Sequence, residues 1–197
     1  MSVLTHPAVP LFTEARTVNS FADTPVSDEQ LSEIWELTRW SPTTANSQPL
    51  RALFIRTPGA KERLLPLLLE SNQAKAASAP VVAVLAYDPD FHQHFDVTFP
   101  ARAEALGALF GGMGEEVRAA TSKHSAAVAA GVFLLAVRAQ GLAAGPMGGF
   151  DAPGVDREFL GGTTWRSHLV VNIGHPGENP WFDRLPRLST DRVVKWL

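Results

Sequence analysis

Six hydroxyl or amide side chains lie within the run from Trp40 to Pro49, WSPTTANSQP. The run has no apolar period and carries two prolines, so it cannot belong to a hydrophobic core. Its polar groups must serve either the backbone of their own loop or a bound ligand. The candidate ligand-binding residues are Pro42, Thr43, Thr44 and Asn46. The alternative is a plain connection between a helix and a strand.

A second candidate lies near the N-terminus, in the segment ARTVNSF. The guanidinium of Arg16 can bind a phosphate through two parallel hydrogen bonds, and Thr17 can add a hydroxyl donor. Asn19 follows two residues later. An ordinary surface arginine at a helix end is the alternative interpretation of this segment.

Two further segments are candidates. One combines an amide with a cation, and the other is a glycine-rich turn with unprotected main-chain N–H groups. Asn72 and Lys75 share one face if their segment is helical, because they are three residues apart. In the turn expected over residues 145–149, the adjacent Gly148 and Gly149 would let the main chain approach a flat ring closely, and Met147 precedes them as a further candidate. A solvated surface pair and a turn that needs positive φ are the alternatives.

Composition excludes several classes of function. The chain has 197 residues, of which 45% are hydrophobic, and a net charge of -3. This size fits a single domain over residues 1–197, and the charge argues against a nucleic-acid partner. The sequence has no cysteine, so disulfides and thiolate catalysis are excluded. The apolar run 126–137 is shorter than the roughly 20 residues that a membrane span needs. No signal peptide is visible, so we expect a cytoplasmic protein without a membrane partner.

Helices and strands alternate irregularly in the expected secondary structure. Ser27 and Gln30 form a capping box at the start of a helix that Pro42 stops. A long helix over 115–140 ends at Gly141. The other expected elements are an extended arm over 1–11, helices over 14–19, 61–70 (broken at Pro66) and 190–197, strands over 52–55, 81–87 and 168–173, and an excursion with short helices over 88–115. These elements predict an α+β sandwich around a small sheet.

Five segments, in this order, resemble the flavin-dependent nitroreductase family. The resemblance covers nearly the whole chain, and five ordered motifs are far more specific than one. It implies an α/β sandwich with a mainly antiparallel sheet flanked by helices, assembled as a homodimer with FMN at the subunit interface. The segments are residues 16–19, 42–49, 72–75, 146–149 and 184–187.

The resemblance also implies roles for the candidate residues. Arg16 and Thr17 would hold the FMN phosphate together with Arg184 or Arg187, whereas residues 42–46 would come from the partner subunit. Lys75 would stabilise the negative charge of reduced flavin. Asn19 stands where many family members have a second cation, and Gly148 where many have glutamate.

The expected reaction is hydride transfer from NADH or NADPH through FMN to a small carbonyl, nitro or quinone substrate. The segments 11–17, 145–151 and 184–189 are similar to one branch of the family, the malonic semialdehyde reductases. The alternatives are a broad-specificity nitro- or quinone reductase, a non-catalytic flavin-binding dimer and a structural dimer. Arg102 is a candidate cation for a substrate carboxylate. No proton donor is identified, and His92 and His94 alone do not predict a metal site.

Overall fold

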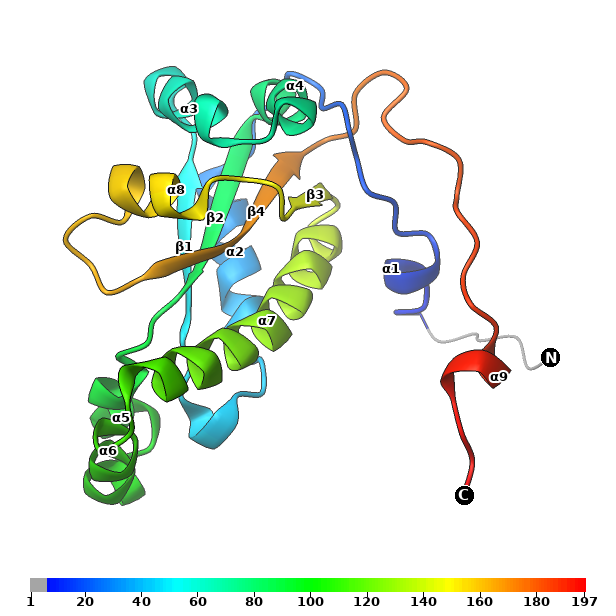
Figure 1. The fold of residues 1–197 in the computed structure, drawn as a ribbon. Helices are drawn as coiled ribbons and strands as arrows, with labels where there is room; N and C mark the ends of the chain where they lie inside the picture. Colours follow the sequence, from blue (N-terminus) through cyan, green and yellow to red (C-terminus); the bar gives the residue numbers. More distant parts are fainter. Residues whose placement is uncertain (1–6) are drawn as a thin grey trace.

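The computed structural model describes residues 7–197. Its centre is a four-stranded sheet in which every neighbouring pair of strands is antiparallel, in the order β1-β2-β4-β3. The strands are β1 (Leu50–Ile55), β2 (Val81–Tyr87), β3 (Ala143–Met147) and β4 (Arg166–Gly174). Figure 1 shows helices packed around this sheet. The expected α+β sandwich with an antiparallel sheet is confirmed.

Helices make up most of the remaining structure, and they differ widely in length. The α-helices are α1 (Pro10–Thr13), α2 (Asp28–Thr38), α3 (Pro58–Leu64), α4 (Glu70–Ser78), α5 (Phe95–Thr98), α6 (Ala103–Gly111), α7 (Glu115–Ala139), α8 (Ala152–Phe159) and α9 (Thr190–Val193). Short 3₁₀ turns are η1 (Thr44–Asn46), η2 (Leu65–Leu67), η3 (Phe91–His94) and η4 (Pro100–Arg102). The predicted helix over 61–70 is divided around Pro66 as expected, since α3 ends at Leu64 and Pro66 lies in the 3₁₀ turn η2 that follows.

The core has two layers, one on each face of the sheet. Successive side chains of a strand point to opposite faces. Val81, Ala83 and Leu85 therefore pack against α2 and α7, whereas Val82 and Val84 pack on the side of α3, α4 and α8. All five are fully buried. This explains why β2 is apolar at every one of these positions, as expected for a central strand.

Helix α7 runs from the region of α5 and α6 to β3 (Figure 1). By length and composition it could cross a membrane, but its buried positions, such as Ala126, Phe133 and Val137, pack into the core beside the sheet. Gly141 follows it with φ of 72°, which confirms the predicted end. At the start of α2, the capping box of Ser27 and Gln30 is confirmed, with hydrogen bonds in both directions.

The N-terminal prediction was wrong in its boundaries. A helix was expected over 14–19, but the helix is α1 and residues 15–18 are not helical. Pro10 favours a helix start because it lacks an N–H and has a suitable φ. The N–H of Asn19 donates instead to the main-chain oxygen of Pro180, 2.8 Å away, which holds the segment beside the C-terminal segment. Of the predicted extended arm, residues 1–6 lie outside the described residues.

The prediction of a turn over 145–149 was also partly wrong. Gly145, Pro146 and Met147 belong to β3 and pair with β4. Glycine and proline weaken strands, but an edge strand tolerates a residue without an N–H. Only Gly148 and Gly149 remain in the turn. The predicted C-terminal helix over 190–197 is likewise reduced to α9, and α2 ends before Pro42, at Thr38.

The excursion over 88–115 forms a small cluster of its own. Phe91, Phe95, Leu106 and Phe110 are buried against one another, away from the two main layers. The expected short helices are confirmed as η3, α5, η4 and α6. The excursion packs beside the loop after α2, where the side-chain amide of Asn46 donates to the main-chain oxygen of Thr98 at 2.6 Å.

Candidate functional site

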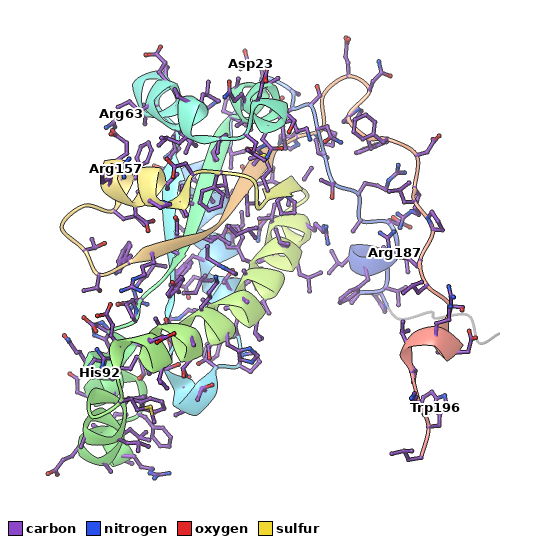
Figure 2. The ribbon with its side chains drawn as sticks, viewed as in Figure 1. Asp23, Arg63, His92, Arg157, Arg187 and Trp196 are labelled. Atoms are coloured by element: carbon purple, nitrogen blue, oxygen red, sulfur yellow. The ribbon has the colours of Figure 1, made fainter. Side chains whose placement is uncertain are left out.

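A polar cavity of about 830 Å³ lies where the two ends of the described chain meet. It brings together predicted residues that are far apart in the sequence. Figure 2 shows Arg187 on the C-terminal segment, beside α1. The predicted residues that line the cavity are Arg16, Thr17, Asn19, Arg184 and Arg187.

Main-chain hydrogen bonds hold the two segments together. Gly177 donates to the oxygen of Ser20 at 2.9 Å, and Phe21 forms a β-bridge with Pro176. Two arginines cross the gap: Arg16 donates to the oxygen of Phe182, and Arg184 donates to the oxygen of Ala15 at 3.2 Å. Main-chain carbonyl oxygens thus hold Arg16 and Arg184 in place, and these neutral groups do not cancel the positive charge of the two guanidinium groups.

The cavity suits an anion. Within residues 7–197, none of Arg16, Arg184 and Arg187 has a carboxylate oxygen within 4.0 Å of its guanidinium. Asp183 also lines the cavity but forms no such ion pair. Arginine binds phosphate better than any other side chain because its donors form a planar fork. The arrangement can therefore hold a phosphate group.

Arg138 is a cavity residue that sequence reasoning missed. It lies in the last turn of α7, and burial lowers the pKa of its guanidinium. Among the described residues its side chain has no hydrogen bond or ion pair. A cation in the last turn of a helix is usually explained by the helix dipole. Its place in the cavity could not be predicted, because no sequence signal relates the end of α7 to residues 16–19.

The third and fourth predicted segments contact each other. Asn72 and Lys75 lie on α4, one turn apart as expected. The side-chain amide of Asn72 donates to the main-chain oxygen of Gly149 at 3.2 Å. Lys75 is half-buried and has no carboxylate partner within the described chain. An unpaired lysine one turn after Asn72 can stabilise negative charge on a ligand bound there.

Glycine allows the N-terminal segment to pack closely on β3. A Cβ on Gly145 would lie 2.8 Å from the main-chain oxygen of Val18, so only glycine lets the segment with Thr17 and Asn19 pack on β3. The side chain of Met147 is buried, and its sulfur lies 3.6 Å from the amide nitrogen of Asn172. A ligand contact from Met147 would therefore use its main chain. Gly148 is exposed beside it.

The loop from Pro42 to Pro49, here called the proline loop, forms a separate part of the candidate site. It lies beside the middle of α7, where Thr44 contacts Ser125. Arg138, in the cavity, lies more than three helical turns further along α7, about 20 Å away at 1.5 Å per residue. The structure thus brings the predicted residues of the two terminal segments into one cavity and joins Asn72 to Gly149 in a second place. It leaves Pro42, Thr43, Thr44 and Asn46 in a third, beside the middle of α7.

The remaining predicted candidates lie in the excursion. Arg102 is exposed at the start of α6 and is not brought into the cavity. The ring of His94 lies 3.8 Å from the carboxylate of Asp88, and Nδ1 of His92 is buried without a partner. Within residues 7–197, no group of three or more histidine, aspartate or glutamate side chains could hold a metal ion.

Comparison with known proteins decides the family. The sequence profile of the nitroreductase family matches residues 13–175. The chain belongs to the nitroreductase family. A relative from Streptomyces coelicolor, provisionally named as a NADH dehydrogenase/NAD(P)H nitroreductase, is 55% identical over 94% of this chain and 91% of its own length.

Solved structures agree with this nitroreductase fold. A provisionally assigned nitroreductase from Bacillus subtilis has a TM-score of 0.87 at 21% identity, over 96% of this chain and 98% of that one. A provisionally assigned nitroreductase from Exiguobacterium sibiricum, solved in complex with FMN, has the same TM-score at 16% identity and full coverage of both chains. At this level of identity the likeness concerns the fold.

Proposed function

We propose that this nitroreductase-family chain is an FMN-dependent oxidoreductase that uses NADH or NADPH. The observation that carries the proposal is the cavity in which Arg16, Arg184 and Arg187 converge, with no carboxylate partner among residues 7–197. Family membership and the names of its relatives support the same activity. We further propose one domain per chain, over residues 1–197, in a cytoplasmic protein.

The residues present fit an FMN molecule. Arg16, Thr17, Arg184 and Arg187 would hold the phosphate, with Arg138 beside them. Asn72 and Lys75 would bind the polar edge of the ring. The exposed main chain at Gly148, where a Cβ would meet nothing within 4 Å, would leave room for its flat face, next to Gly149. When bound, the flavin would supply hydride transfer between the nicotinamide and the substrate.

A homodimer would complete the site. In one protomer the proline loop and the cavity lie about 20 Å apart along α7. The cavity of one subunit would therefore bind its ligand together with the proline loop of the other subunit. The C-terminal segment also exposes apolar side chains that a second chain could cover: Phe182, Leu185, Leu188, Val193 and Trp196. Figure 2 shows Trp196 far from the sheet. Light scattering is the test, and a monomer mass would contradict this assembly.

We propose malonic semialdehyde, reduced to 3-hydroxypropanoate, as the substrate. The proposal rests on the resemblance of segments 11–17, 145–151 and 184–189 to that branch of the family. The alternative is a broad-specificity nitro- or quinone reductase, which the names of the relatives favour. A flavin-binding dimer without turnover is a third candidate.

A visible absorption spectrum of the purified protein tests the cofactor. We expect flavin bands that bleach when NADH or NADPH is added without oxygen. Persistent bands would favour the non-catalytic dimer, and protein that stays colourless after incubation with FMN would overturn the proposal. Steady-state assays that compare malonic semialdehyde with nitrofurazone and menadione would then separate the two reductase candidates.

A further inference from the structure

Backbone strain is concentrated in the proline loop. Ala45, Asn46 and Gln48 have φ of 51°, 53° and 43°, in the left-handed region that residues with a Cβ rarely adopt. Each such residue is energetically unfavourable and persists only when its surroundings hold it. In the rest of the described chain, Asn179 alone of the non-glycine residues has positive φ. Something must therefore fix this loop.

Ser125 makes a reciprocal contact with the loop. The main-chain N–H of Thr44 donates to Oγ of Ser125 at 3.2 Å, and that hydroxyl donates to Oγ1 of Thr44, also at 3.2 Å. Ser125 is 2% exposed and lies on α7, whose packing in the core makes it a rigid support. Ser125 therefore joins the loop to α7 at two points of the same residue, the N–H and the hydroxyl of Thr44.

The contact fixes the polarity of the Thr44 hydroxyl. Because its oxygen accepts the proton of Ser125, its own O–H is directed elsewhere, and Thr44 is exposed. Other side chains of the loop are already engaged. Oγ1 of Thr43 accepts from the N–H of Gln48 at 3.1 Å, and the amide of Asn46 contacts both Thr98 and Gln48. Thr43 and Thr44 both accept a hydrogen bond and keep an O–H to donate, but Thr44 is the exposed one of the two and is held by α7.

We propose that Ser125 is a positioning residue that holds the strained proline loop and presents the Thr44 hydroxyl as a donor to an acceptor atom of the flavin. The inference rests on the proposed function, because the acceptor belongs to the proposed cofactor. Carbonyl oxygens and ring nitrogens of a flavin are suitable acceptors. Ser125 itself would act only through Thr44.

The test measures FMN affinity of the full-length protein after removal and re-addition of FMN. Ser125→Ala should weaken binding about tenfold, the value of one well-placed hydrogen bond. Ser122→Ala is the matched control. Ser122 is equally buried on the same helix, but its hydroxyl donates to the oxygen of Asp88 at 2.8 Å and does not contact the loop. It should leave FMN affinity unchanged.

A double mutant tests whether Ser125 acts through Thr44. Thr44→Val should weaken FMN binding to a similar extent, and the double variant should bind no more weakly than Thr44→Val alone. The visible absorption bands of bound flavin should shift in the same way in both single variants. A purely structural role of Ser125 would not produce this shared shift.

The outcomes separate the inference from the proposed function. Failure of the unmodified protein to bind FMN would overturn both. Normal FMN binding by Ser125→Ala, or independent losses that add in the double variant, would overturn the inference alone. Ser125→Cys is the variant to use if Ser125→Ala does not fold, since it keeps the shape but bonds weakly. It should then show the same loss of affinity.

Discussion

Asn72 donates a hydrogen bond from Nδ2 to the main-chain oxygen of Gly149, 3.2 Å away and 77 residues further along the chain. The N–H of Leu69 donates to the same oxygen at 3.1 Å. The start of α4 and the turn after β3 are therefore fixed to each other. Two segments that the sequence resemblance treats as separate motifs form one structural unit.

This contact predicts different effects for two neighbouring glycines. A Cβ on Gly149 would lie 2.5 Å from Cδ1 of Leu69 and 3.1 Å from Nδ2 of Asn72. We expect Gly149→Ala to lower the free energy of unfolding by about 1–2 kcal/mol and to weaken FMN binding. Gly148→Ala is the control for stability alone, because a Cβ there would meet nothing within 4 Å. Chemical denaturation of both variants checks this, and equal stabilities would contradict it.

Lys75 should control the reduction potential of bound FMN. Its half-buried ammonium has no carboxylate partner in the described chain, so it can stabilise the anionic reduced flavin. Lys75→Ala should destabilise reduced FMN relative to oxidised FMN by about 1–3 kcal/mol. A redox titration measures this as a lower potential. Arg63→Ala removes an exposed cation of α3 and serves as the control. A potential that is unchanged in Lys75→Ala would argue against this role.

Arg138 should contribute to recognition of the phosphate group. Arg138→Gln should reduce the affinity for FMN about tenfold. Binding of riboflavin, which has no phosphate, should stay the same. The ratio of the two affinities thus distinguishes phosphate recognition from a general loss of structure. Arg39→Gln is a suitable control, since Arg39 lies on the surface and pairs with Glu36. Equal losses for FMN and riboflavin would leave Arg138 as a helix-end residue only.

His168 should make stability depend on pH. Burial, followed by repulsion from Lys123, lowers the pKa of His168 below its ordinary 6.5. The unfolded chain then binds a proton more readily than the folded protein, so the free energy of unfolding falls as the pH drops below about 6.5. Urea denaturation at about pH 7.5 and about pH 5.5 should show a smaller loss for His168→Gln than for the unmodified protein. The exposed His124→Gln should behave like the unmodified protein.

Local sequence signals predicted the helix ends well where one or two residues determine them. Ser27 and Gln30 mark the start of α2, and Gly141 marks the end of α7. Strand β3 was missed because Gly145 and Pro146 disfavour strands. These residues become part of a strand through their pairing with β4, which the local sequence does not indicate. Helix α1 was misplaced because contacts with residues near Pro180 determine where the N-terminal helix ends.

The same limit applies to the candidate site. Motif residues could be found in the sequence because their order resembles a family. Ser125 and Arg138 could not, because both lie on α7 and matter only through segments that folding brings next to them. In a stretch of small residues, Ser125 looks like one more packing position. Its role depends on a contact with Thr44 across 81 residues of sequence.

The meeting of the two chain ends has a consequence for the order of events in the cell. The phosphate cavity needs both Arg16 and Arg187, which lie far apart in the sequence and are therefore made at different times. Domains fold as units during or after synthesis, at about 5–20 residues per second. The cavity therefore cannot close around a phosphate before the segment with Arg187 has been made. We expect FMN to be loaded only after that segment has folded against the segment with Arg16.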